Sequence, residues 1–113
     1  MARYETLPVY GKTYDLTIKI YELCSNLSND LKYSLGESLK RDSLLLLREI
    51  YRINRSEDKS KFFERFLDHF ELVKLEIRLC FDMKGITSKK HAELSLLMDD
   101  IGKQINGWKK NRS

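Results

Sequence analysis

The longest helical pattern in the chain, Ser60 to Asp82, constrains its fold more than any other segment. This segment contains neither proline nor glycine. Because a surface helix of a monomer needs one apolar stripe, a second apolar row predicts contact with another subunit. The first row recurs every three or four residues and consists of Phe63, Phe66, Phe70, Val73, Ile77 and Cys80, while the second consists of Leu72, Leu75 and Leu79.

Two cations in the same segment, Lys74 and Arg78, are one helical turn apart and therefore lie side by side. One interpretation is a solvated strip of charge, and spacing alone favours it. The other is part of a surface that binds an anionic partner.

Three further segments have helical spacing, and none has the alternation of a strand. The first predicted helix is also apolar on two sides, with Tyr14, Ile18 and Tyr21 forming its second stripe. The sequence therefore predicts an all-α, up-down-up-down antiparallel four-helix bundle that forms one domain over residues 1–113. The other helices are predicted from the N-cap Thr13 to about Leu27, from Gly36 to Asn54, and from a cap at Thr87 or Ser88 to about Trp108.

The ends of these elements carry their own signals. Residues 1–12 are predicted to be an extended lead-in, because Pro8 disfavours helix at Leu7 and Gly11 breaks the segment after it. Gly85 is predicted to end the longest helix in the left-handed conformation that glycine tolerates. Residues 109–113 are predicted to be a frayed basic tail.

Composition narrows the functional classes. The net charge is +4, a mild preference for anionic partners. No run approaches the roughly 20 apolar residues of a membrane span, and the N-terminus has no long apolar segment of a secretory signal. Cys24 and Cys80 lie in apolar helical stripes, which indicates buried thiols in a reducing compartment. We therefore expect a cytoplasmic protein without a membrane partner.

Catalytic and metal-binding patterns are missing from the sequence. His69 and His91 have no partner at metal-ligand spacing, and there is no glycine-rich phosphate loop. The acidic residues of the longest helix are expected mostly off its main apolar row. We expect no enzyme activity, no metal and no cofactor.

Basic side chains favour binding of a polyanion, which needs several cations on one surface without intervening acids. Arg48, Arg52 and Arg55 recur along one edge of the second predicted helix, although Glu49 lies close in sequence and weakens this hypothesis. A passive protein-interaction module would have the same composition and stays open as an alternative. The full set of candidates is Arg41, Arg48, Arg52, Arg55, Lys74, Arg78, Lys89, Lys90, Lys109, Lys110 and Arg112.

Several short motifs occur in order along the chain: Leu7-Pro8-Val9-Tyr10, Thr13-Tyr14-Asp15-Leu16, Tyr33-Ser34-Leu35-Gly36-Glu37, Ile50-Tyr51-Arg52 and the close from Ile101 to Trp108. Together they resemble the accessory variability determinant proteins of diversity-generating retroelements. The wider group includes four-helix-bundle proteins encoded by intervening sequences in bacterial ribosomal RNA genes, and the motif at 33–37 favours the retroelement branch.

The resemblance implies a homopentameric ring of four-helix bundles around a central pore. It also implies two partners, a reverse transcriptase and the template-repeat RNA or DNA of mutagenic reverse transcription. Lys74 and Arg78 match the family's basic pair in the third helix, and Lys109, Lys110 and Arg112 match its basic tail. The arginines at 48, 52 and 55 match no family motif. The alternative function is that of a ribosomal RNA intervening-sequence protein that binds nucleic acid or protein.

Overall fold

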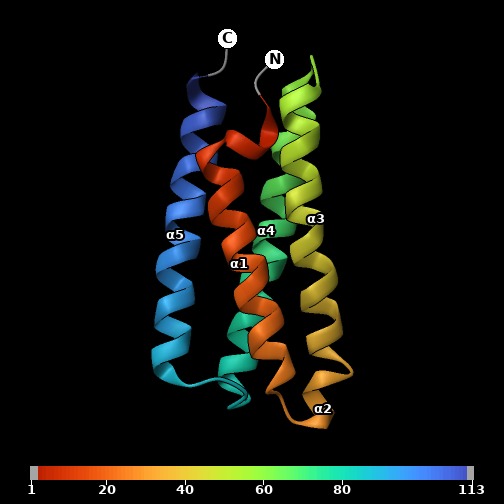
Figure 1. Cartoon of the computed structure of the whole chain (residues 1–113), viewed down its shortest axis with the longest axis vertical. Helices are drawn as coiled ribbons and strands as arrows, with labels where there is room; N and C mark the ends of the chain where they lie inside the picture. Colours follow the sequence, from red (N-terminus) through yellow and green to blue (C-terminus); the bar gives the residue numbers. More distant parts are fainter. Residues whose placement is uncertain (1–2, 112–113) are drawn as a thin grey trace.

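The structure is a computed structural model that describes residues 3–111, and its regular elements are all helices (Figure 1). Four long helices form an antiparallel bundle about 45 Å in length. The predicted all-α fold with four main helices is thereby confirmed for the described residues. In chain order, the elements are the 3-10 turn η1 (Tyr4–Thr6), α1 (Pro8–Ser25), the single turn α2 (Asn29–Lys32), α3 (Leu35–Arg55), α4 (Lys59–Asp82) and α5 (Ser88–Asn111).

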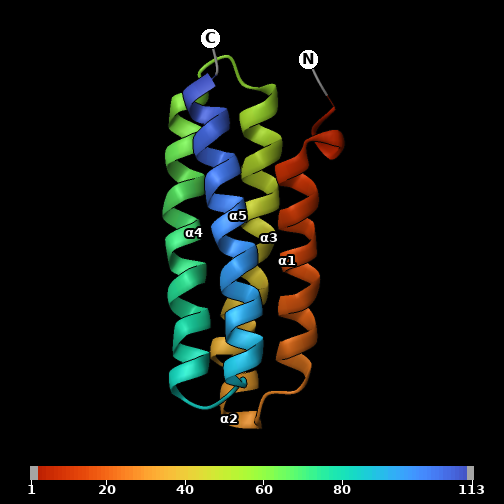
Figure 2. The same cartoon turned by 90° about the vertical axis from the view of Figure 1, so that its left-hand side faces the viewer.

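In cross-section, the four long helices lie at the corners of a square. Helix α3 packs against α1 and α4, and α5 packs against the same two helices. Figure 2 shows α1 and α4 on opposite sides of the bundle with α3 and α5 between them. The outward faces of α1 and α4 therefore lie at opposite corners of the molecule.

The core is built from the apolar rows that the spacing predicted. The whole main row of α4, from Phe63 to Cys80, is buried. Each fully buried large apolar side chain contributes about 1.5–3 kcal/mol relative to exposure, so these rows hold the bundle together. The second rows remain on the surface of the single chain: Leu75 of α4 is 55% exposed and Tyr14 of α1 is 50% exposed.

The predicted start of the first helix is wrong. Helix α1 begins at Pro8, and η1 precedes it, so residues 4–12 are mainly helical rather than extended. Proline suits the first helical position, because its fixed φ matches the helix and an N–H there has no intrahelical acceptor. Thr13 is consequently a buried interior residue, and its Oγ1 donates to the carbonyl of Val9 at 2.8 Å.

The connection between α4 and α5 ends α4 in an unexpected way. The left-handed residue is Lys84, with φ 63°, and not Gly85. The Lys84 N–H donates to the Phe81 carbonyl and the Gly85 N–H to the Cys80 carbonyl at 2.7 Å, the two bonds of a Schellman motif. Gly85 is needed for space, because a Cβ there would lie 2.9 Å from Leu27 Cδ2.

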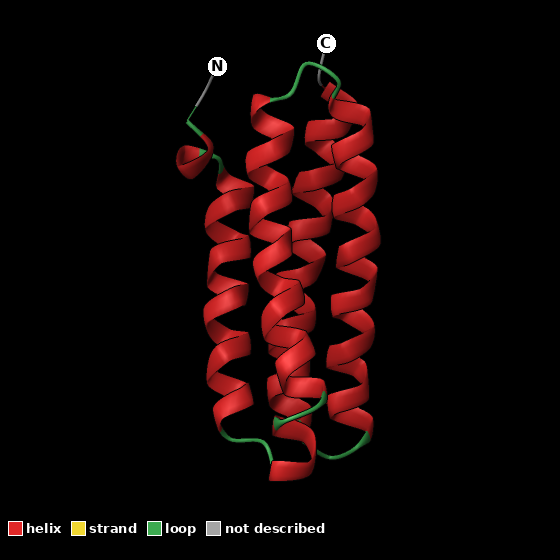
Figure 3. Cartoon of the chain, turned by 90° about the vertical axis from the view of Figure 1, so that its right-hand side faces the viewer, coloured by secondary structure: helices red, strands yellow, loops and turns green. Residues whose placement is uncertain are grey.

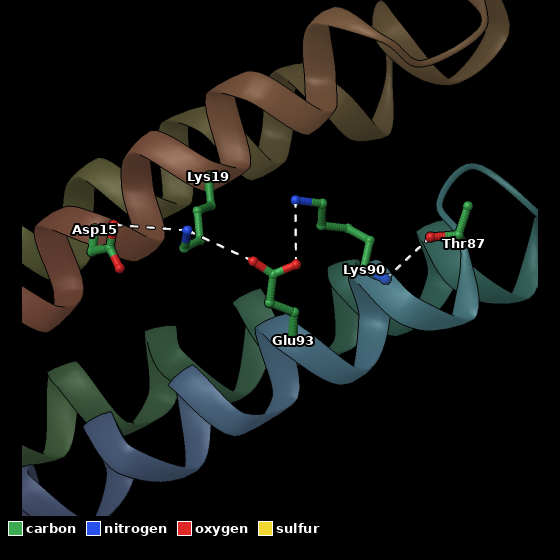
Figure 4. A network of polar contacts seen from close by, with 5 residues as sticks. All are labelled: Asp15, Lys19, Thr87, Lys90 and Glu93. Atoms are coloured by element: carbon green, nitrogen blue, oxygen red, sulfur yellow. Dashed lines mark hydrogen bonds and ion pairs between the residues drawn. The ribbon is translucent and has the colours of Figure 1, made fainter.

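The start of α5 and its contact with α1 are visible in Figure 4. The Lys90 N–H donates to Thr87 Oγ1 at 3.1 Å, which confirms Thr87 as the N-cap of α5. Lys19 of α1 lies between Asp15 on its own helix and Glu93 of α5, with its Nζ 3.8 Å from Glu93 Oε1. Such exposed pairs add little stability but help to fix how α1 and α5 align.

The end of α5 also differs from the prediction. The helix continues through Lys109 and Lys110 to Asn111, so residues 109–111 do not form a frayed tail. Contacts with α4 explain this. The Trp108 ring packs edge-on against the Phe63 ring, with 5.2 Å between the ring centres, and Lys109 forms an ion pair with Glu64. Residues 112 and 113 lie outside the described part of the chain.

Candidate nucleic-acid interface

Arg48, Arg52 and Arg55, here called the arginine edge, follow the C-terminal half of α3. Arg48 and Arg55 are exposed and Arg52 is partly exposed. None of the three lies within ion-pair distance of a carboxylate of residues 3–111. Glu49 does not neutralise them, because it faces the core and is only 1% exposed. The arginine edge therefore presents positive charge to solvent.

Lys74 and Arg78 are also on the surface, but each already has an acidic partner on α4. Lys74 Nζ lies 2.7 Å from Glu71 Oε1, and Arg78 Nε lies 3.0 Å from Asp82 Oδ1. Lys74 also lies 5.1 Å from the centre of the Phe70 ring. A phosphate would have to compete with these carboxylates, so this pair offers less free charge than the arginine edge.

The basic end of α5 and the C-terminal end of α3 lie at the same end of the bundle, although α5 packs against α1 and α4. Figure 3 shows the α3–α4 connection next to the end of α5, and both chain termini are at this end of the bundle. Lys109 pairs with Glu64 at 2.8 Å, Lys110 is exposed, and Arg112 lies outside the described residues. The structure thus gathers Arg52, Arg55 and Lys110 at one end of the molecule.

Lys74 and Arg78 do not belong to this group. At 1.5 Å per residue, they lie roughly 22 and 28 Å along α4 from its start. The remaining sequence candidates are also elsewhere: Arg41 lies 3.5 Å from Asp42, Lys90 lies 3.6 Å from Glu93, and Lys89 is exposed at the start of α5.

Sequence reasoning missed three buried acids. Asp42 and Glu49 of α3 and Glu76 of α4 are each at most 5% exposed. Burial is the main cause that raises the pKa of Glu76 to about 8; a hydrogen bond and charge interaction with Asp42 add to the shift, and Arg41 opposes it. Glu76 therefore holds a proton at neutral pH and can donate it in its hydrogen bond to Asp42 across the α3–α4 contact.

Neither cysteine is suited to act as a nucleophile. Cys24 and Cys80 are buried free thiols, as predicted. Burial raises the pKa of each to about 11, so both stay protonated and unreactive at neutral pH. Within residues 3–111, no group of three or more His, Cys, Asp or Glu side chains is arranged to hold a metal ion.

The first and last motifs of the resemblance meet in space. Leu7, Pro8 and Val9 line a hollow of about 250 Å³ together with Gln104, Gly107 and Trp108. A family model described as bAvd-like matches residues 9–112. The chain belongs to the bAvd-like family. A comparison with curated proteins found no match.

This bAvd-like chain also exposes two apolar patches. Tyr14, Ile18 and Tyr21 form one on α1, and Leu72, Leu75 and Leu79 form the other on α4. Because α1 and α4 occupy opposite corners, the two patches face away from each other. No helix in the described part of the chain combines the length and the hydropathy needed to cross a bilayer.

Proposed function

We propose that this bAvd-like chain is a non-enzymatic accessory protein of a diversity-generating retroelement. It binds the reverse transcriptase and the template-repeat RNA or DNA, and so supports mutagenic reverse transcription. Membership of the family supports the biological setting. The observation that carries the nucleic-acid part is the arginine edge, which has no acidic partner among the described residues.

Physical chemistry supports a polyanion as the ligand of this edge. Arg48, Arg52 and Arg55 are spaced by four and three residues and therefore share one side of α3. Arginine presents a planar fork of donors that matches two phosphate oxygens at once. Each contact with a phosphate releases counterions, so binding by such an edge weakens steeply as salt rises.

We further propose that the functional form is a homopentameric ring. Contact between one patch on α1 and a different patch on α4 of the next copy is head-to-tail, and such contacts close into rings when the rotation permits. The exposed patches at opposite corners suit this arrangement. A ring would repeat the arginine edge five times and concentrate positive potential toward a nucleic acid.

The first prediction concerns the arginine edge. Changing Arg48, Arg52 and Arg55 together to Gln should weaken RNA binding and reduce the slope of log affinity against log salt by roughly 0.7–0.9 for each lost phosphate contact. Fluorescence anisotropy with a labelled template-repeat RNA, measured at several salt concentrations, gives both quantities. The double variant of Lys74 and Arg78 to Gln is the matched comparison, and we expect a smaller loss per charge because these cations already have acidic partners.

An unchanged salt slope in the triple variant would show that the edge does not contact phosphates. A co-purification with the reverse transcriptase tests the second partner separately. Loss of RNA binding with retained co-purification would place the two partners on different surfaces.

The second prediction concerns assembly. Leu75→Asp places a charge in the centre of the α4 patch, and we expect it to convert the assembly to monomers, because burying an unpaired charge at a subunit contact is costly. Light scattering coupled to size exclusion reports the mass directly. Leu96→Asp is the control, since Leu96 is 73% exposed on α5 and outside both patches. A wild-type chain that stays monomeric at micromolar concentration would rule out the ring.

A further inference from the structure

A hollow of about 400 Å³ opens at the end of the bundle where α3 ends and α4 begins. Its lining consists of Tyr51, Arg52, Arg55, Ser56 and Phe62. Two aromatic rings and two guanidinium groups thus surround a single space at the end of the arginine edge. This combination differs from Lys74 and Arg78 on α4, where the cations lie beside carboxylates.

The aromatic walls are held in place from behind. Phe62 packs against the core with part of its ring accessible. The Tyr4 ring packs edge-on against the Tyr51 ring, with 5.1 Å between the ring centres, and against the Tyr10 ring, with 5.2 Å between the centres. The turn η1 therefore supports the Tyr51 ring, so a planar ligand would meet a wall that is already ordered.

Of the two arginines that line the hollow, Arg55 is directed at an aromatic ring, and neither is paired with an acid of the described residues. Arg55 lies 5.4 Å from the centre of the Tyr51 ring and donates to its hydroxyl oxygen. Outside the lining, Arg65 and Lys61 lie 5.2 and 5.6 Å from the centre of the Phe62 ring. Glu57 and Asp58 occupy the adjacent turn, but neither is paired with Arg52 or Arg55. The guanidinium groups thus remain available to an anion.

We propose that this hollow binds one unpaired nucleotide, with the base against Phe62 and Tyr51 and its phosphate at Arg52 and Arg55. The inference rests on the proposed nucleic-acid function and adds a preference for single strands. A base that stacks on an aromatic side chain is stabilised whatever its identity, so the contact needs no sequence match. A duplex offers the same phosphates but keeps its bases stacked inside, so it gains nothing from the rings.

The test compares Phe62→Leu with the wild type on a single-stranded RNA, on a duplex of the same sequence, and on a single strand without bases. Leucine keeps an apolar side chain against the core and leaves the net charge unchanged. We expect affinity for the intact single strand to fall about tenfold, which corresponds to about 1.4 kcal/mol. Affinity for the duplex and for the strand without bases should not change.

Two matched variants serve as controls. Phe62→Tyr keeps the ring and should bind as the wild type does, and Tyr33→Leu removes an exposed ring near α2, at the opposite end of the bundle, without effect. An RNA with 2-aminopurine in place of one base gives a direct signal, because stacking on Phe62 should quench its fluorescence in the wild type and not in Phe62→Leu.

The outcomes distinguish the nucleotide site from the proposed nucleic-acid binding on which it rests. Equal affinity for single strand and duplex, unchanged by Phe62→Leu, would overturn the hollow as a nucleotide site and leave the arginine edge intact. Full competition by a polyglutamate peptide that spares duplex binding would assign the hollow to an acidic protein segment instead. Absence of any salt-dependent nucleic-acid binding would overturn both proposals together.

Discussion

The free energy of unfolding should fall as the pH rises from about 4.5 to about 8, because Glu76 holds its proton in the folded chain. The pKa of Glu76 is raised from 4.5 to about 8, first by burial and then by its hydrogen bond and charge interaction with Asp42. Below pH 4.5 the carboxyl is protonated in both states. Between the two values only the folded state keeps the proton, so stability is lost by up to about 1.4 kcal/mol per pH unit.

The variant Glu76→Gln should remove most of this slope, since glutamine has a similar shape, can still hydrogen-bond with Asp42 and does not ionise. At pH 8 it should be the more stable of the two proteins. Urea unfolding followed by circular dichroism at steps between pH 5 and 8.5, at one protein concentration, measures the effect.

Glu71→Gln is the matched control, because Glu71 is an exposed acid of the same helix that pairs with Lys74. Its profile should run parallel to that of the wild type. If Glu76→Gln also ran parallel, the buried acid would be ionised in the folded chain and the assignment of its proton would be wrong.

Two adjacent residues after α4 should respond to substitution in opposite directions. Gly85→Ala should lower the free energy of unfolding by about 1–3 kcal/mol, the usual cost of overpacking. Its Cβ would lie 2.9 Å from Leu27 Cδ2 and 3.1 Å from the backbone carbonyl oxygen of Cys80, which cannot move without disturbing the Schellman motif.

Lys84→Gly should leave stability unchanged or raise it by up to about 1 kcal/mol, because Lys84 has a φ of 63° that glycine adopts without strain. Thermal and urea unfolding of the two single variants decide the matter. A neutral Gly85→Ala would show that the space beside Leu27 accommodates a Cβ, and a stability loss in Lys84→Gly would show that the lysine side chain stabilises the turn by more than its positive φ costs.

Helix positions were predictable wherever the apolar spacing was regular. The pattern from Ser60 to Asp82 matches α4 (Lys59–Asp82) to within one residue, and the predicted 36–54 lies inside α3 (Leu35–Arg55). The start of α1 was not predictable in this way, because proline breaks a helix in its interior and favours one at its first position. Burial of Val9 in the core, which depends on residues distant in sequence, decides between these effects.

The burial of the three acids was indicated by their spacing, although their charge argued against it. Glu76 is three residues after Val73 and four before Cys80, and Asp42 and Glu49 stand at matching intervals from Leu39, Leu46 and Ile53. Spacing thus placed all three acids inside the apolar rows. Charged groups are normally exposed unless paired, which explains why Glu76 was expected off the main apolar row of its helix.

The candidate site depends on side-chain directions that a sequence leaves undetermined. The spacing of the arginines predicted a shared edge, but whether acids neutralise a cation depends on side chains three or four residues away and on their direction. Glu49 turns inward from the arginine edge, whereas Glu71 and Asp82 turn toward Lys74 and Arg78. The hollow needed η1 beside α3, a contact between residues 4 and 51 that no local pattern encodes.

The turn η1 and the end of α5, near the two ends of the described chain, lie at the same end of the bundle as the end of α3 (Figure 1). An affinity tag or fused fluorescent protein at either terminus would therefore crowd the surface on which every binding assay depends. A probe at Lys89, exposed at the far end, would avoid this interference. A Lys89→Cys variant would accept a thiol-reactive dye selectively, since both natural thiols are buried and protonated.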